Sequence, residues 1–505
     1  MQTFPVRLDT HKPLYQQLYA ALRERIVTGD LGPGDRLPPT RDMARDLGVS
    51  RNVVVAAYDQ LLSEGYVQAR VGSGTWVSPQ LPDTRLTTVT PTVQNGGSGR
   101  SVQPQLSELA RRAVAANPVG RDRQVLQARA GAIPFALETT LRDESAVATW
   151  NSLARRRRNH TPDGFGPPEG SLELRRALAS YLHRSRGIQA DADQILILTG
   201  VQQAIDLIGR AVLQPGSGVL MEDPGYHGAR LAFEAFGAHL IPCPVDREGM
   251  AVAGADTREL PAQLAFVTPS HQFPTGVVMS LARRQELLAW ASAADALVVE
   301  DDYEGEFRFD DRPLPAIHAL DGEGRTVYIG SFSRLLYPDV RLGYAVLPSS
   351  LVEPAIALKR LSDWYTPTTT QSVLAELLDD GHYERHLRRL QQQMTRRRDV
   401  LLDSLEKHFG GAVEVTGAES GLHVMVWFPE PGPEEEAALL AHARDMGVGV
   451  NPLSPLCLSR PERLAVVLGY SGLEEAEIRE GARRLRKAWQ ATRRAAFPSS
   501  AVPVA

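Results

Sequence analysis

Residues that can bind an anion or exchange a proton follow five short apolar runs in this 505-residue sequence. The runs are ILIL at 195–198, GVLM at 218–221, LAFV at 264–267, ALVVE at 296–300 and TVYIG at 326–330. Helical stretches separate these runs, and the alternation predicts a mostly parallel sheet with helices on both faces. Because ligand sites in such sheets lie beyond the carboxyl ends of the strands, we expect a site there.

The residues directly after the runs are the candidates for that site. After ILIL, the phrase Thr199-Gly200-Val201-Gln202 opens a helix, whose N-terminus can bind an anion. The other runs lead to the following segments: 222–226 with Tyr226, 268–276 with His271, 301–303 with Asp301 and Tyr303, and 331–334 with Ser331, Ser333 and Arg334, then Arg341. His271 either faces the site or is a hydrogen-bonded structural histidine.

The first 78 residues predict a small helical module with a hairpin. Leucines and an isoleucine spaced four apart over 12–28 form one apolar helical stripe. Thr40 can cap a second helix that ends at Gly48, and Ser50 can cap a third, whose inner face includes Leu61 and Leu62. Two short helices joined by a tight turn are typical of a helix-turn-helix, and the two β-rich runs after it are typical of a wing.

The third helix of this module has the residues of a DNA-reading helix. Arg51 and Asn52 stand at its N-terminus, where Arg can pair with guanine and Asn with adenine. Ser50 and the helix amides suit a phosphate, and Arg41 and Arg45 on the second helix suit the DNA backbone. Gly72 at the wing tip would let the backbone approach the groove. Each arginine alone could equally be a solvated surface charge.

Three phrases of this module, RLPPTRDMARDLGVSRNVV, AYDQLLSEGY and RVGSGTWV, resemble the winged helix of the bacterial GntR regulators. From residue 130 on, further phrases resemble a fold-type I aminotransferase that uses pyridoxal 5′-phosphate (PLP): GFGPPEGSLELRRALASYL, TGVQQAIDLI, EDPGY, TPSHQFPTG, EDDYEGEF, RLGY, GHYERHLRRL, GLHVMVWF and NPLSPL. The two together resemble the MocR/GabR subfamily of GntR regulators. The implied fold is a winged helix-turn-helix followed by an α/β PLP-transferase-like domain with a smaller α+β C-terminal part.

The resemblance implies roles in binding PLP. Asp301 would pair with the pyridine nitrogen, Tyr303 would touch the ring hydroxyl, and Tyr226 would stack on the ring. The phosphate cradle would consist of Gly200, Val201, Gln202, Ser331, Ser333 and Arg341.

The family's Schiff-base lysine would stand directly after Ser-Phe-Ser, where this sequence has Arg334. A guanidinium stays protonated below a pKa of ~12 and cannot form that bond. The chain has 55 basic residues, and only Lys12, Lys359, Lys407 and Lys487 are lysines, none of them evidently placed to substitute. We therefore expect no ordinary transamination, no catalytic residue, and PLP bound at most non-covalently.

Three further positions depart from the family. Phe165 replaces a frequent tyrosine that reaches the neighbouring subunit's phosphate, and Val201 replaces a Thr or Ser of the phosphate loop. Val467-Leu468-Gly469-Tyr470 aligns with the phrase that often carries the arginine for the substrate carboxylate. Together with Arg334, these changes suggest that selection on the ligand has been relaxed or redirected.

Three functions remain open at this point. The first, which we favour, is a homodimeric DNA-binding regulator that senses a small molecule: PLP, a PLP–amino-acid adduct or an anionic metabolite paired to Arg334. The second is an active PLP enzyme fused to a DNA-binding domain, which Arg334 disfavours. The third is a constitutive DNA-binding dimer with the large domain as scaffold, which the retained PLP residues disfavour. The partners would be an operator in double-stranded DNA, the effector and a second copy of the chain.

Composition sets the remaining limits. The net charge of −5 excludes a bulk polyanion binder, and no apolar run approaches the ~20 residues of a membrane helix. Two cysteines are too few for a disulfide framework, and we expect no metal site. The N-terminus has no secretory pattern, so we expect a cytoplasmic protein. The expected domains are 1–78, a mostly flexible linker over 79–129 with a helical tendency near LSELARRAVAA, and 130–500 with a small part at about 400–495.

Overall fold

The chain divides into two compact units, Met1–Pro104 and Gln105–Ala505. The computed structural model describes residues 13–70, 73–82, 105–116, 131–137, 139, 143–157, 164–255, 260–309, 314–336 and 338–496. The wing glycine Gly72, Lys12 and most of the predicted linker 79–129 lie outside the described residues.

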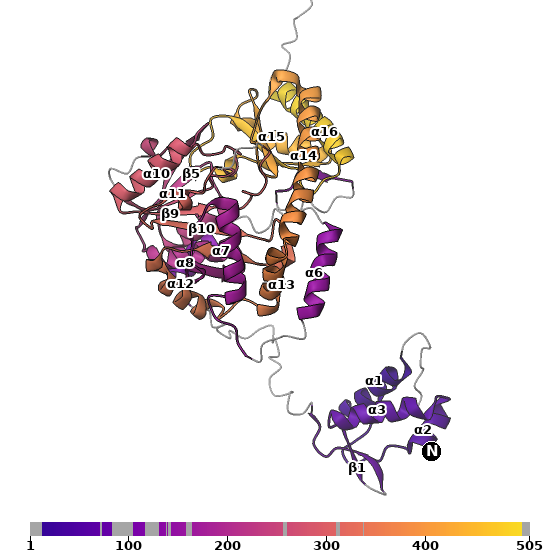
Figure 1. The fold of residues 1–505 in the computed structure, drawn as a ribbon. Helices are drawn as coiled ribbons and strands as arrows, with labels where there is room; N and C mark the ends of the chain where they lie inside the picture. The colour runs from indigo at the N-terminus through magenta and orange to yellow at the C-terminus, as the bar shows by residue number, and fades with distance from the viewer. Residues whose placement is uncertain are drawn as a thin grey trace, which may run out of the picture. The chain divides into compact units, whose positions relative to one another are not determined.

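The N-terminal unit is a winged helix, as predicted (Figure 1). Helices α1 (Leu14–Val27), α2 (Thr40–Leu47) and α3 (Arg51–Ser63) precede an antiparallel hairpin of β1 (Val67–Arg70) and β2 (Gly74–Val77). The apolar stripes of α1 and α3 form the core, and Gly48 ends α2 in a left-handed conformation with φ 66°. This packing positions the N-terminus of α3 at the surface.

Two details of this unit differ from the prediction. Thr40 is the first residue of α2 rather than its cap, because Pro39 occupies the N-cap position and no side chain caps the helix. Leu62 is 42% exposed, although it was expected on the inner face. It lies one residue, or about 100° around the helix, beyond the buried Leu61.

The second unit is built on an eight-stranded sheet of order β4-β11-β10-β9-β8-β5-β6-β7. Its strands are β4 (Ile195–Leu198), β5 (Gly218–Asp223), β6 (His239–Asp246), β7 (Gly249–Met250), β8 (Ala262–Val267), β9 (Leu297–Asp301), β10 (Thr326–Ser331) and β11 (Gly343–Val346). Neighbours from β6 to β10 pair in parallel, whereas β11 is antiparallel to both β10 and β4. The five predicted strands are therefore present, and their carboxyl ends share one edge.

Helices cover both faces of this sheet, as the alternating pattern predicted (Figure 1). One face packs against α8 (Val201–Val212), α9 (His227–Phe236) and α12 (Ser349–Ser362). The other packs against α7 (Leu172–Arg186), α10 (Leu281–Ala294), α11 (Ile317–Leu320) and α13 (Thr368–Asp379). Helix α6 (Glu144–Arg157) packs against α13.

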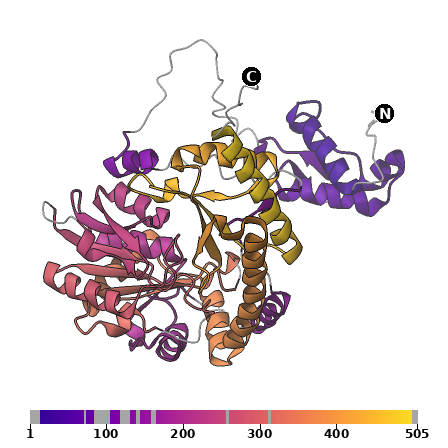
Figure 2. The same ribbon diagram turned by 90° about the horizontal axis from the view of Figure 1, so that it is seen from above.

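A smaller sheet completes the second unit (Figure 2). Its order is β12 (Glu414–Thr416), β13 (His423–Phe428), β16 (Leu464–Gly469) and β15 (Asn451–Pro452). The long α14 (His382–Phe409) packs against α16 (Glu475–Ala496), which also contacts α15 (Glu436–Asp445). A short parallel pair joins β3 (Ile133–Pro134) to β14 (Val448–Gly449).

The helical tendency predicted within the linker is realised in α4 (Glu108–Ala116), which packs against α9 and so belongs to the second unit. This part of the predicted linker is therefore not a free tether. Among the described residues, no helix combines the length and apolar character needed to span a bilayer.

Candidate functional site

The carboxyl edge of the large sheet gathers the residues predicted to hold a phosphate. Gly200 is the N-cap of α8 with φ 146°, a conformation that favours glycine. A β-carbon on Gly343 would stand 2.9 Å from Cα of Gly200, so both positions must stay small for the backbones to approach. A β-carbon on Gly200 would in turn lie 3.9 Å from Nη1 of Arg341, so this guanidinium borders the helix terminus.

The serines after β10 lie at the same edge. The backbone N–H of Ser333 donates to Oγ of Ser331 at 3.3 Å, and Ser331 pairs with Gly343 in the β10–β11 register. Oγ of Ser333 is buried and has no hydrogen-bond partner. Val201 and Gln202 form the first turn of α8, where Nε2 of Gln202 donates to the carbonyl of Gly228 at 3.0 Å. A buried hydroxyl without a partner beside a helix N-terminus is a place where an anion can be bound.

The predicted ring-stacking residue, Tyr226, is held by close aromatic packing. Its ring stacks on Phe266 at a centroid distance of 6.3 Å and meets Phe273 edge-on at 5.9 Å. A β-carbon on Gly228 would stand 2.6 Å from the Tyr226 hydroxyl, so only glycine allows this ring position. Tyr226 therefore presents a partly buried aromatic face that is fixed before any ligand arrives.

Asp301 ends β9 as a buried carboxyl, and no described residue forms an ion pair with it. It is 3% exposed, and its Oδ1 has no hydrogen-bond partner. Burial raises the pKa of this carboxyl well above its usual value, the neighbouring Asp302 raises it further, and Arg334 lowers it. A ligand that brings a hydrogen-bond donor or a positive charge to Oδ1 would stabilise this buried carboxyl group.

Asp302 and Tyr303 have partners within the chain. Asp302 accepts a hydrogen bond from Nε of Arg186 at 2.7 Å and another from the Tyr328 hydroxyl at 2.6 Å. The Tyr303 hydroxyl donates to the backbone carbonyl of His271 at 2.8 Å. Its oxygen can still accept a hydrogen bond, so a contact with a ligand hydroxyl stays open.

Arg334 lies beside this group and forms a buried ion pair that the sequence did not reveal. Its Nη1 donates to Oε1 of Glu304 at 2.8 Å and to the backbone carbonyl of Leu137 at 2.7 Å. Its guanidinium lies over the Tyr303 ring, 5.7 Å from the centroid. Glu304 is fully buried, whereas the Arg334 side chain is 25% exposed, so the arginine is the member of the pair that a ligand can reach.

None of the lysines that the structure describes offers an amine to this site. Lys359 is buried in α12, and its Nζ donates to both carboxylate oxygens of Asp363 at 2.7 and 2.9 Å. Lys407 and Lys487 are exposed on α14 and α16. The described part of the chain therefore brings a guanidinium, and no primary amine, to the position after Ser-Phe-Ser.

The other departures from the family pattern lie as follows. The ring of Phe165 is 78% exposed and packs edge-on against Trp364 and Tyr365. The segment aligned with the carboxylate-binding arginine is buried at the end of β16, and the Tyr470 hydroxyl donates to the carbonyl of Gly421 at 2.6 Å. That segment supplies no cation to the site.

Glu222 is a second buried carboxyl near Tyr226. It accepts hydrogen bonds from the Thr268 hydroxyl at 2.6 Å, from the Thr268 N–H at 3.2 Å and from Nε2 of Gln272 at 3.1 Å. Burial nevertheless raises its pKa to about 7. Because this value lies above the unfolded-state value of 4.5, the folded protein binds the proton more tightly than the unfolded chain does.

Glu222→Gln should therefore change the pH dependence of stability. The contribution of the Glu222 carboxyl to the free energy of unfolding falls as the pH rises from 4.5 to about 7 and stays low above that. The amide imitates the protonated acid, so the variant should be more stable than the wild type at alkaline pH, by up to about 3 kcal/mol. Urea unfolding across this pH range measures the difference, with exposed Glu353→Gln as control; a gap that does not vary with pH would contradict it.

In the winged helix, the predicted DNA-reading residues share one exposed end of α3. Ser50 is the N-cap of α3 but makes no side-chain cap hydrogen bond. Arg51 and Asn52 are exposed in the first turn, and Nε of Arg51 lies 3.4 Å from the Thr40 hydroxyl. These three side chains are therefore available together at the helix terminus, where phosphates and base edges are read.

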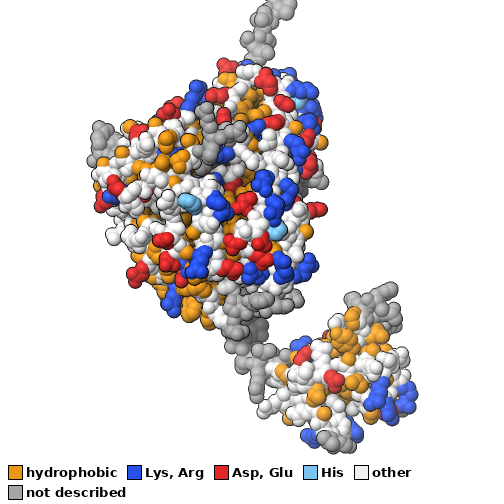
Figure 3. Space-filling model, in the orientation of Figure 1, with side chains coloured by type: hydrophobic (Ala, Val, Ile, Leu, Met, Phe, Trp, Pro, Cys, Tyr) orange, Lys and Arg blue, Asp and Glu red, His pale blue; other side chains and the backbone are white. Residues whose placement is uncertain are grey.

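The second helix and the wing add more cations. Arg41 and Arg45 are exposed on α2, and Arg45 forms an ion pair with Asp42. Two arginines that the sequence reasoning missed, Arg36 and Arg70, flank the Trp76 ring at 5.6 and 5.7 Å. The apolar-run pattern could not reveal them, although both stand next to the glycine-rich wing. Figure 3 shows Lys and Arg side chains gathered on one side of this unit.

Comparison with known proteins covers both units. A model of the bacterial regulatory proteins of the gntR family matches residues 14–77, and a model of aminotransferase class I and II matches residues 136–485. The two matches correspond to the winged helix and to the unit that carries the two sheets.

Two curated relatives match nearly the whole chain, and a solved structure matches a smaller part of it. The probable rhizopine catabolism regulatory protein MocR of Rhizobium meliloti is 35% identical over 96% of this chain and 95% of its own. The pyridoxine biosynthesis transcriptional regulator PdxR of Corynebacterium glutamicum is 30% identical over 94% and 96%. α-Aminoadipate aminotransferase of Thermus thermophilus, complexed with N-(5′-phosphopyridoxyl)-L-leucine, superposes with a TM-score of 0.67 at 28% identity, over 77% of this chain and 97% of the enzyme.

Proposed function

The chain belongs to the gntR-family regulators that carry an aminotransferase class I and II domain, and from this premise we propose that it is a bacterial transcription factor that senses a small molecule without transaminating it. The observation that carries the proposal is the ion pair between Arg334 and the buried Glu304, at the position where the family's lysine would stand. Its place of action would be the cytoplasm, where the operator is.

The DNA-binding half of the proposal is supported by the exposed terminus of α3. Arg51 and Asn52 would read base edges in the major groove, while Ser50, Arg41 and Arg45 would hold phosphates. The wing, with the predicted contact Gly72 and the exposed Arg70, would follow the adjacent DNA backbone together with Arg36, which precedes α2 and is bridged to Trp76 of β2. Contacts to base edges and contacts to phosphates are both required for sequence-specific binding to an operator.

The sensing half is supported by how well the edge of the large sheet fits PLP. The unpartnered Oδ1 of Asp301 suits a protonated pyridine nitrogen, and the unpartnered Oγ of Ser333 suits a phosphate oxygen. Gly200, Val201, Gln202, Ser331 and Arg341 would complete the phosphate site, and Tyr226 and Tyr303 would hold the ring. When bound, PLP supplies an aldehyde and an electron-withdrawing ring.

Covalent capture of that aldehyde needs a neutral primary amine, which Arg334 lacks. The partly exposed guanidinium of Arg334 would instead bind an anionic group, in PLP, in a PLP–amino-acid adduct or in another anionic metabolite. The name of the relative PdxR and the phosphopyridoxyl-leucine bound to the Thermus enzyme favour the first two of these effectors.

A homodimer is supported by an exposed apolar patch on the second unit. Phe165 is 78%, Leu361 80% and Trp364 55% exposed, and the Phe165 and Trp364 rings touch at a centroid distance of 5.7 Å. Contiguous exposed apolar side chains of this size are typical of interfaces. A second copy of the chain would cover them and would place two winged helices for two half-sites, so that effector binding could shift the dimer arrangement that fits the operator.

The proposal predicts that wild-type protein binds PLP reversibly. Purified protein is mixed with PLP, treated with borohydride and analysed by mass spectrometry. The only covalent PLP should be the background on exposed lysines. Dialysis should remove the bound PLP completely. An adduct at Lys359, the one buried lysine among the described residues, would contradict this expectation and favour the alternative of an active PLP enzyme fused to a DNA-binding domain.

A further inference from the structure

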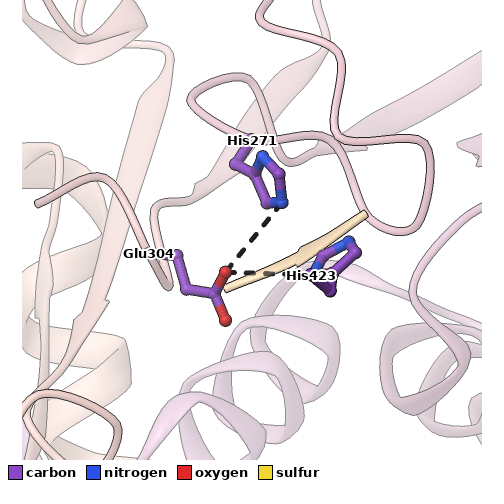
Figure 4. Close-up of side chains that lie close together, drawn as sticks. All are labelled: His271, Glu304 and His423. Carbon is purple, nitrogen blue, oxygen red and sulfur yellow. Dashed lines mark ion pairs between the residues drawn. The ribbon is translucent and has the colours of Figure 1, made fainter. Parts of the chain in front are cut away.

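Three electron-pair donors converge next to Arg334, between the large and the small sheet of the second unit (Figure 4). They are Nε2 of His271, a carboxylate oxygen of Glu304 and Nδ1 of His423. His271 follows β8, Glu304 follows β9, and His423 begins β13. All three residues are at most 2% exposed, so bulk water does not separate them.

The distances bring the three donors within reach of one ion. Oε2 of Glu304 lies 4.0 Å from Nε2 of His271 and 3.9 Å from Nδ1 of His423, and all three donor atoms lie within 4.8 Å of one another. Zinc binds imidazole nitrogen at about 2.0–2.1 Å and carboxylate oxygen at about 2.0–2.2 Å. A tetrahedral zinc ion with bonds of this length holds its donor atoms about 3.4 Å apart, so each of the two measured separations must shorten by about half an ångström when the ion binds.

The hydrogen bonds on the far side of each imidazole direct its lone pair inward. Nδ1 of His271 lies 2.9 Å from Oγ of Ser420, which itself donates to the carbonyl of Ser270, so this nitrogen is the donor. Nε2 of His423 donates to the carbonyl of Pro274 at 3.2 Å. Nε2 of His271 and Nδ1 of His423 are then the unprotonated nitrogens, as in histidines that bind a metal.

The nitrogen of His271 that faces Glu304 has no hydrogen-bond partner. Two lone pairs and a carboxylate therefore face one another without a hydrogen atom between them, which is unfavourable unless a cation fills the space. Glu304 is held from outside by the Leu422 N–H on Oε2 at 2.8 Å and by Arg334 on Oε1, so its position does not depend on the histidines.

Two glycines, Gly421 and Gly276, leave room for the imidazole of His271. A β-carbon on Gly421 would stand 2.2 Å from Nε2 of His271, and one on Gly276 would stand 2.9 Å from its Cε1. Both glycines have positive φ, 75° and 72°. The ring is thus clamped by two segments that belong to different sheets.

We propose that His271, Glu304 and His423 form a binding site for one divalent transition-metal ion, with zinc as the best match to two imidazoles and one carboxylate. Three protein ligands leave a further coordination position for water or for a donor atom of a small molecule. Bound there, the ion would join the small sheet to the carboxyl edge of the large one, next to the guanidinium of Arg334. The site does not depend on PLP.

Zinc titration of the full-length, tag-free protein after chelator treatment and without PLP tests the proposal. Calorimetry should show one tight zinc site per chain, and the same addition should raise Tm. Cobalt in place of zinc should give visible absorption bands from a site with imidazole ligands. His271→Gln and Glu304→Gln should each weaken zinc binding by more than the ~10- to 100-fold that the loss of an outer-sphere partner costs.

The exposed His239→Gln serves as the matched control and should bind zinc like the wild type. Leu422 and Arg334 donate to different oxygens of Glu304, so Glu304→Gln keeps an acceptor for one of them and loses the other. It gives a second test of ligation if His271→Gln does not fold. If zinc changes neither the calorimetric signal nor Tm of the wild type, the proposal is overturned. A proton shared by the three side chains, or the ion pair of Glu304 with Arg334, would then be enough to hold them together. Equal zinc binding by the wild type and a folded variant would overturn it as well.

Discussion

If the wild type binds PLP only reversibly, as proposed, Arg334→Lys should give a protein that carries about one covalent cofactor per subunit. In the proposed site, the residues assigned to the ring and the phosphate are present, and the missing part is a primary amine at position 334. The change should therefore be nearly all-or-none: wild-type protein stays at background after borohydride reduction, and the variant gains the mass of reduced PLP on the peptide that spans position 334. Before reduction, the variant with PLP should show a new visible absorption band, which borohydride should abolish.

The ion pair with Glu304 predicts how this adduct depends on pH. In the wild type, the buried carboxylate of Glu304 lies 2.8 Å from the Arg334 guanidinium. In the variant, the same carboxylate would hold the new amine in its charged form. Only the neutral amine attacks an aldehyde, so adduct formation should rise steeply toward alkaline pH. Adding Glu304→Gln should move that rise to lower pH, and chelator treatment keeps any metal out of both measurements.

Two controls separate the amine from the other effects of the substitution. Arg334→Gln removes the cation without supplying an amine and should stay at background. Lys359→Arg in the Arg334→Lys background removes the buried lysine that is bound to Asp363 and should leave the adduct intact. If Arg334→Lys binds no PLP at all, the phosphate and ring contacts assigned to Gly200, Asp301 and Arg341 are wrong.

The sequence was sufficient to predict those candidate site residues that directly follow a strand. Five apolar runs predicted five strands, and each strand carried its next residues to the shared carboxyl edge, as happened for Gly200, Asp301 and Ser331. The continuous apolar run of a buried parallel strand is a local feature of the sequence, so these strands could be predicted without knowing any long-range contact. Strands β11 and β6 of this sheet were missed for lack of an unbroken aliphatic run: glycine and tyrosine begin β11 (Gly343–Val346), and two prolines interrupt β6 (His239–Asp246).

Contacts between distant segments could not be predicted in this way. Glu304 stands only one residue after Tyr303, yet its partners Arg334 and Leu422 come from another loop and another sheet. The convergence of His271 and His423 likewise depends on how the small sheet docks on the large one. The expectation of no metal site came from counting cysteines, a criterion that is blind to a site made of imidazoles and a carboxylate.

The single side chain with the largest expected effect on DNA binding is Arg51. In the first turn of α3 its guanidinium is exposed, with only a 3.4 Å contact to Thr40, so it can turn toward a guanine at little cost. A bidentate arginine–guanine pair contributes about 1–3 kcal/mol of discrimination, equivalent to roughly 5- to 150-fold in affinity. Arg51→Ala should lower operator affinity within that range and relax the preference at one base pair of each half-site.

Arg45→Ala provides the contrasting case, because Arg45 is proposed to contact the DNA backbone and already pairs with Asp42. Its loss should weaken binding to operator and unrelated DNA alike and lower the salt dependence by about one counterion. Gel-shift titrations with both DNAs at several salt concentrations measure the two effects, with Arg247→Ala on the second unit as the charge-matched control. If Arg51→Ala weakens operator and unrelated DNA equally, Arg51 contacts phosphate, and sequence must then be read from Asn52 or from the wing.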